Sequence, residues 1–139
     1  MMKQLMTLSF ALVMLMGSLS CGAQIKKTVK ATAVSSKVEV YYFHFTRRCH
    51  TCETVESESK KAVSALYPDQ VKKGTTTFQA INLDDESSKK IAERLKVSGQ
   101  SLLVVKNGKQ KDLTDKAFMY ATTTPEKLQA EIKKAIESL

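Results

Sequence analysis

Two cysteines, Cys49 and Cys52, are the residues of this sequence best placed to do chemistry. Only His50 and Thr51 separate them, and a disulfide across so small a loop contributes little as a structural cross-link. Their spacing is typical of thiol–disulfide exchange or of half a metal site. The third cysteine, Cys21, falls in an N-terminal segment that we expect to be removed or lipidated. Cys49 and Cys52 are therefore the only pair expected in the mature chain.

The cysteine pair falls between a predicted strand and a predicted helix. At such a junction, free N–H groups and the positive end of the helix dipole stabilise a thiolate. We predict that Cys49, at the helix tip, is the exposed nucleophile. Cys52, one turn further, would close the disulfide after a mixed-disulfide intermediate. Arg47, Arg48 and His50 add positive charge, which is expected to lower the pKa of Cys49 and raise the reduction potential above that of thioredoxin.

A metal site is the alternative use of the same residues. His44 ends the predicted strand, and we favour a structural role for it over one as a ligand beside the cysteines. Zinc accepts Cys and His ligands, but His50 is poorly placed to bind the same ion as its neighbour Cys49. Cuprous copper, which needs only two or three soft ligands, fits the pair better. We predict no resident metal and no cofactor, with copper binding as the alternative.

Two elements position the pair. Residues 37–45 predict a strand, and its apolar residues on both faces indicate burial on both sides, as in a parallel sheet. Residues 52–67 predict a helix with one apolar stripe, ended by Pro68. Further along the chain we predict a strand over 76–83 and then a helix that is capped by the acidic run 84–86 and closed by Gly99. A strand over 101–106 follows, with a hairpin turn at Asn107–Gly108. Thr124 and Pro125 open a last helix.

The predicted order of elements is β-α-β-α-β-β-α. A right-handed β-α-β unit followed by a helix and an antiparallel hairpin gives an α/β fold. We therefore expect a mixed four-stranded sheet with helices on both faces.

Residues 1–23 have the pattern of a secretory signal peptide. A positive start is followed by an apolar run over 5–16 and then by small residues, and the run is too short to cross a bilayer as a helix. We predict a periplasmic or secreted protein cut after Ala23. The alternative is a lipoprotein attached through Cys21, a reading weakened by Ser18 where such proteins carry Leu. Residues 24–36 are predicted to be a linker and residues 37–139 one domain.

The chain is basic, with a formal net charge of +8. Lysine pairs on solvated helix faces explain this charge, because no exposed aromatic residues are interleaved with them as in nucleic-acid-binding surfaces. We expect a monomer that does not bind nucleic acid and touches a membrane only if Cys21 is lipidated. Its expected partner is a protein thiol or disulfide, or a redox enzyme.

The sequence resembles the thioredoxin-like superfamily over residues 37–139. The resemblance rests on Val40–Phe43 before Cys49–Cys52, on Ile81–Asp84, and on Leu102–Lys109, which looks like the thioredoxin third strand and hairpin. Within the superfamily the chain looks most like the small exported ArsF-type proteins, labelled nitrophenyl compound nitroreductase subunits. The resemblance implies a thiol–disulfide oxidoreductase or electron-relay protein. An accessory module docking on a redox enzyme is a further alternative.

Three departures from the superfamily pattern bear on the site. Gln100 stands where the family has a cis-proline, and the resemblance places Gln100 and Ser101 in a loop that faces the substrate. The chain contains no Trp, so the usual residue before the first cysteine is replaced by Arg48. Tyr42 occupies about the place of the family's buried acid, and Glu56 and Lys60 are the candidates to substitute for that acid.

Overall fold

The computed structural model describes residues 36–139, which belong to one compact unit. The predicted signal segment 1–23 and nearly all of the predicted linker 24–36 lie outside the described residues. The elements are β1 (Val38–His44), α1 (His50–Leu66), α2 (Pro68–Lys72), β2 (Thr76–Asn82), the 3₁₀ turn η1 (Glu86–Ser88), α3 (Lys89–Leu95), β3 (Ser101–Lys106), β4 (Lys109–Asp112), α4 (Thr114–Tyr120) and α5 (Pro125–Ser138).

The four strands form one mixed sheet in the order β2-β1-β3-β4. β1 pairs in parallel with β2 and antiparallel with β3, and β3 pairs antiparallel with β4. At the end of β1 nearest the cysteines, Phe43 lies opposite Ile81 on one side and Ser101 on the other. This sheet confirms the predicted α/β class and is consistent with a thioredoxin-like α/β fold.

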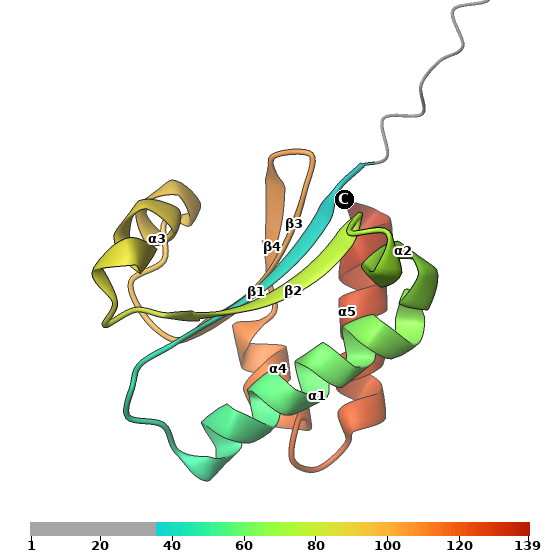
Figure 1. The fold of residues 1–139 in the computed structure, drawn as a ribbon. Helices are drawn as coiled ribbons and strands as arrows, with labels where there is room; N and C mark the ends of the chain where they lie inside the picture. Colours follow the sequence, from blue (N-terminus) through green and yellow to red (C-terminus); the bar gives the residue numbers. More distant parts are fainter. Residues whose placement is uncertain (1–35) are drawn as a thin grey trace, which may run out of the picture. The chain divides into compact units, whose positions relative to one another are not determined.

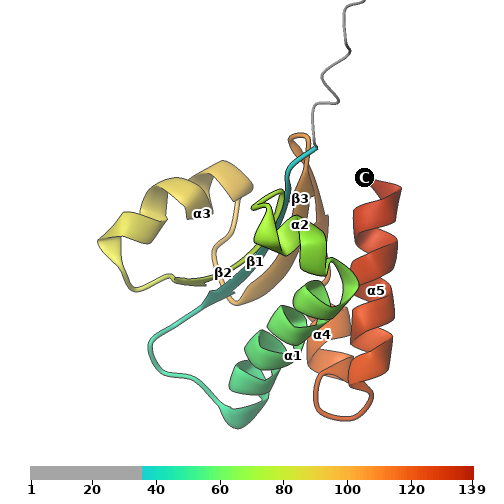
Figure 2. The same ribbon diagram turned by 45° about the vertical axis from the view of Figure 1, so that its right-hand side comes forward.

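Helices cover both faces of the sheet, as predicted (Figures 1 and 2). On one face, α1, α4 and α5 pack against the sheet around a core that includes Val40, Tyr42 and Val104. On the other face, α3 packs against the alternate residues Tyr41 and Phe43. Both sets of side chains are buried, because successive residues of a strand point to opposite faces. β1 is therefore enclosed on both sides, which holds its carboxyl end in place.

The helices differ from the sequence prediction at three places. α1 begins at His50, two residues earlier than predicted, because Cys49 already serves as its N-cap. Pro68 starts the short helix α2 at its first position as well as ending α1, a place where its missing N–H costs nothing. α4 was not predicted, although its buried residues and those of its caps follow the four-residue spacing of a helical stripe.

The segment before β3 differs from the prediction at both ends. Asp85 precedes the 3₁₀ turn η1 and Glu86 is the acid of its first turn, both within the predicted run 84–86, but α3 itself starts only at Lys89. The helix ends at Lys96, whose φ of 56° is left-handed, and not at Gly99. The predicted hairpin is confirmed, since Asn107 and Gly108 both have positive φ, as a tight two-residue turn requires. Among the helices of the described range, none has the length and apolar character needed to cross a membrane.

Candidate functional site

Cys49 lies exposed at the start of α1, as the last residue of the loop that leaves β1. Its backbone is extended, and its Sγ accepts a hydrogen bond from the Cys52 N–H at 3.2 Å. Its carbonyl oxygen accepts the first helical hydrogen bond, from the Glu53 N–H at 3.1 Å. The sulfur therefore sits where the unpaired N–H groups of the first turn point, which favours a negative charge on it.

Cys52 is the buried member of the pair, with 4% of its surface exposed. It forms a disulfide with Cys49, and their Cα atoms are 5.1 Å apart. One turn of helix places Cys52 on the inner side of α1 while Cys49 faces solvent. The two sulfurs thus differ in accessibility, and an incoming reagent can reach only one of them without moving the chain.

Gln100 lies directly before β3 and reaches across to the cysteine pair. Its Nε2 lies 3.5 Å from Cys52 Sγ and can donate to it, and its Oε1 lies 3.8 Å from the same sulfur. The position was predicted to face the substrate, but the side chain contacts the buried cysteine. Its neighbour Ser101 also turns to the protein, where its Oγ donates to the Gly99 carbonyl at 3.0 Å.

Arg48, the loop residue before Cys49, pairs with a carboxylate of α1. Its Nη1 donates to Glu56 Oε2, and each side chain keeps 28% of its surface exposed. Arg47 and His50, which flank Arg48 and Cys49 in the sequence, are exposed. The three predicted cationic residues do surround Cys49 in sequence, but the charge of Arg48 is shared with Glu56. Lys60, the other residue proposed in place of a buried acid, is exposed.

The loop between β1 and α1 is tied to the loop that follows β2. The Thr46 N–H donates to Asp84 Oδ2 at 2.7 Å, and Asn82 Nδ2 donates to Thr46 Oγ1 at 2.9 Å. The backbone hydrogen bond from Thr46 is the largest cause that lowers the pKa of the Asp84 carboxyl below its usual value. Asp84 was predicted to cap a helix, so its structural role was missed. The sequence contained one signal for this contact: the predicted parallel pairing of these two strands brings their carboxyl ends to the same edge of the sheet.

His44 is buried at the end of β1 and belongs to the protein's own hydrogen-bond network. Its Nδ1 donates to the Phe45 carbonyl at 3.0 Å, in line with the structural role favoured from the sequence. In the part of the chain that the structure describes, no three His, Cys, Asp or Glu side chains are arranged to hold a metal ion.

At the interface between β1 and α1, the hydroxyls of Tyr42 and Ser59 are buried without a protein hydrogen-bond partner among the described residues. Tyr42 is fully buried, and this burial raises the pKa of its hydroxyl to about 12. The Arg48 charge opposes this rise and the Glu56 charge adds to it. Tyr42 therefore stays protonated over the range in which cysteines ionise and supplies a neutral hydroxyl to this interface.

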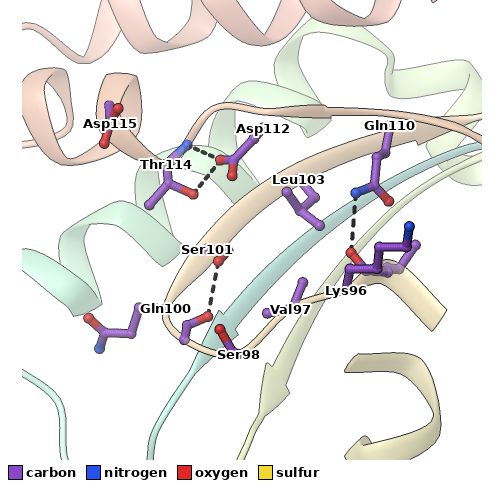
Figure 3. Close-up of a pocket in the computed structure, with 12 residues that line it drawn as sticks. Lys96, Val97, Ser98, Gln100, Ser101, Leu103, Gln110, Asp112, Thr114 and Asp115 are labelled. Carbon is purple, nitrogen blue, oxygen red and sulfur yellow. Dashed lines mark hydrogen bonds between the residues drawn. The ribbon is translucent and has the colours of Figure 1, made fainter. Parts of the chain in front are cut away.

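A hollow of about 420 Å³ opens beside Gln100, between the loop before β3 and the start of α4. Gln110, Asp112 and Asp115 line it together with the backbone turn at Ser98 (Figure 3). Figure 3 shows the Gln100 side chain at the edge of this group, extending away from Gln110 and Asp112. Among the described residues 36–139, Gln100 is thus the one residue lining the hollow whose side chain also lies within hydrogen-bonding distance of the cysteine pair.

Comparisons with known proteins give this chain no family. No family model and no curated protein matches it. Among solved structures, one described as the structure of a malarial protein aligns with a TM-score of 0.46 and 21% identity. The alignment covers 71% of this chain and 97% of the other.

Proposed function

We propose that this protein is an extracytoplasmic thiol–disulfide oxidoreductase or electron-relay protein of the thioredoxin-like superfamily. The observation that carries the proposal is the unequal placement of the pair. Cys49 is exposed as the N-cap of α1, and Cys52 is buried one turn inside it and bonded to it. An exposed sulfur at a helix N-terminus with a buried partner suits attack by one thiol and closure by the other.

In the proposed reaction the reduced pair transfers two electrons to a disulfide of a protein partner. The Cys49 thiolate attacks one sulfur of that disulfide, which forms a mixed disulfide and releases the partner's first thiolate. The Cys52 thiolate then attacks Cys49 Sγ, closes the Cys49–Cys52 bond and releases the second thiolate. The released thiolates take up the protons that the two cysteines lost. The steps run in reverse when the oxidised pair accepts electrons.

The first prediction is that the pair equilibrates with a glutathione redox buffer as one two-electron couple. The helix N-terminus and the basic residues before Cys49 stabilise the reduced form, so the midpoint should lie above about −270 mV, the potential of thioredoxin. The measurement is the fraction of free thiol against buffer potential. A pair that does not respond would favour the accessory, non-redox module.

Alkylation of the reduced protein at mildly acidic pH tests the two roles. Cys49 should react first, because it is exposed and its thiolate is favoured. The matched variants are Cys49→Ser and Cys52→Ser, of which only the second should keep the fast reaction. Preferential labelling of Cys52 would reverse the assignment.

A further inference from the structure

Gln100 is the side chain that the fold brings to the buried sulfur of the pair. Among residues 36–139, the hydrogen-bonding side-chain partner of Cys52 Sγ is the Gln100 amide, with Nε2 at 3.5 Å and Oε1 at 3.8 Å. The two residues lie 48 positions apart in the sequence. Gln100 is half-buried, and its amide is the hydrogen-bonding group that it places beside the buried sulfur.

The backbone on both sides fixes where this amide can reach. Ser101, the next residue, begins β3 and pairs with Phe43 of the central strand. Its hydroxyl also holds the preceding turn through the Gly99 carbonyl. Gln100 lies in the bend before β3, and the pairing of Ser101 anchors that bend from the next residue on.

We propose that Gln100 is a catalytic residue of the exchange reaction, whose side-chain N–H donates to the Cys52 thiolate while the disulfide closes. The proposal rests on the function proposed above and adds a residue to it. A thiolate at a site that is only 4% exposed loses most of its hydration, so it needs a donor from the protein. A hydrogen bond to an ionised group is stronger than a neutral one, and the amide supplies it without adding charge.

The donor acts at one step only. In the mixed disulfide, Cys52 gives up its proton to solvent, and its thiolate attacks Cys49 Sγ to form the intramolecular bond. The partner's sulfur leaves as a thiolate and is protonated by solvent. Gln100 neither gains nor loses a proton. It lowers the free energy of the anion before attack, so its effect should fall on closure and not on the first attack by Cys49.

The experiment follows the two steps separately, using the reduced protein and dithiobis-nitrobenzoate. Attack by Cys49 releases one coloured thiolate, and closure by Cys52 releases the second. Gln100→Met keeps the length of the side chain and removes the amide. We expect the second release to slow about tenfold, the scale of losing a hydrogen bond to a charged group, with the first release unchanged. The pH profile of the second release should also move to higher pH.

Two further variants make the test specific. Gln110→Met alters another glutamine of the same hollow, whose Nε2 donates to the Leu95 carbonyl at 3.2 Å, and should leave both steps unchanged. Gln100→Glu replaces the donor by a carboxylate and should slow closure more than Gln100→Met does. An unchanged second step in both Gln100 variants, or an equal loss in Gln110→Met, would overturn the proposal. A wild-type protein that releases no coloured thiolate would instead refute the proposed function.

Discussion

At the scale of single residues, the positive charge of Arg48 acts on two groups, the reactive sulfur of Cys49 and the carboxylate of Glu56. Arg48 stands directly before Cys49, which predicts that its guanidinium stabilises the thiolate. The same guanidinium donates to Glu56, two turns into α1. Arg48 cannot lose its charge by deprotonation, but a carboxylate in contact reduces the field that Cys49 experiences. Glu56 is therefore expected to limit the effect of Arg48.

The second prediction concerns this division of charge. Glu56→Gln should free Arg48 and lower the pKa of Cys49, whereas Arg48→Ala should raise it. Each shift should be up to about one unit, the low end for a charge within ~4–6 Å, because solvent and salt screen an exposed loop. The measurement is thiolate absorbance against pH in a Cys52→Ser background, where Cys49 is the only thiol of the mature domain that titrates.

A matched control lies on the same helix. Glu58 pairs with Lys61 at 2.7 Å, away from the cysteines, so Glu58→Gln removes a similar ion pair and should leave the titration unchanged. Shifts of the same sign in Glu56→Gln and Arg48→Ala would show that Arg48 acts by a route other than its charge.

At the scale of elements, the interface between β1 and α1 contains buried polar groups. Tyr42 of β1 and Ser59 of α1 are fully buried, and their hydroxyls have no partner within the described protein. Burying a hydroxyl without a hydrogen bond costs about 1–3 kcal/mol, so replacing it with an apolar group of similar shape costs little. Desolvation raises the pKa of Tyr42 from 10.0 to about 12.

The third prediction follows from that raised pKa. Above pH ~10, Tyr42 ionises in the unfolded chain but stays protonated in the folded one, so the folded state binds more protons and stability falls with pH. The contribution of Tyr42 to the free energy of unfolding is fully present below the pKa of an unfolded tyrosine. It is lost as pH rises through the folded-state pKa of about 12. Tyr42→Phe should therefore match or exceed wild-type stability at neutral pH and lose less of it in alkali.

Urea unfolding at neutral pH and above pH ~10 measures this difference. Tyr120→Phe is the matched control, because Tyr120 lies on α4 between Lys116 and Lys127 and outside the β1–α1 contact. Tyr41 and Tyr67 also have pKa values raised by burial, so part of the alkaline loss should remain. An equal alkaline loss in wild type and Tyr42→Phe would contradict the prediction.

At the scale of the whole molecule, the cellular compartment decides whether the pair can cycle as a disulfide. Disulfides persist outside the cytoplasm, where thiols are not kept reduced. The fourth prediction is that the mature protein begins near Gln24, or at a lipidated Cys21, after removal of a signal segment. Mass spectrometry of protein from its native host reads this directly. An intact Met1 would contradict both the export and the proposed compartment.

The sequence alone determined those elements whose signals are local. The strand Ser101–Lys106 and the turn at Asn107–Gly108 lie where they were predicted, since β-branched runs and turn residues act on their own backbone. Pro125 begins α5 for the same reason. The helices α2 and α4 span five and seven residues. The prediction missed both: α2 is little more than one turn, and two of the three residues buried along α4 are alanines, whose apolar signal is weak. Packing against neighbouring elements stabilises such short helices.

The sequence also determined the pair itself, because the spacing of Cys49 and Cys52 at a strand-to-helix junction is a local property. Only the tertiary structure decided what surrounds it. Gln100 reaches Cys52 because β3 pairs antiparallel with β1, and Asp84 reaches Thr46 because β2 pairs in parallel with β1. Residues 48 and 38 positions apart meet there, and such meetings depend on which strands pair and in which direction, which the pattern along a single strand does not specify.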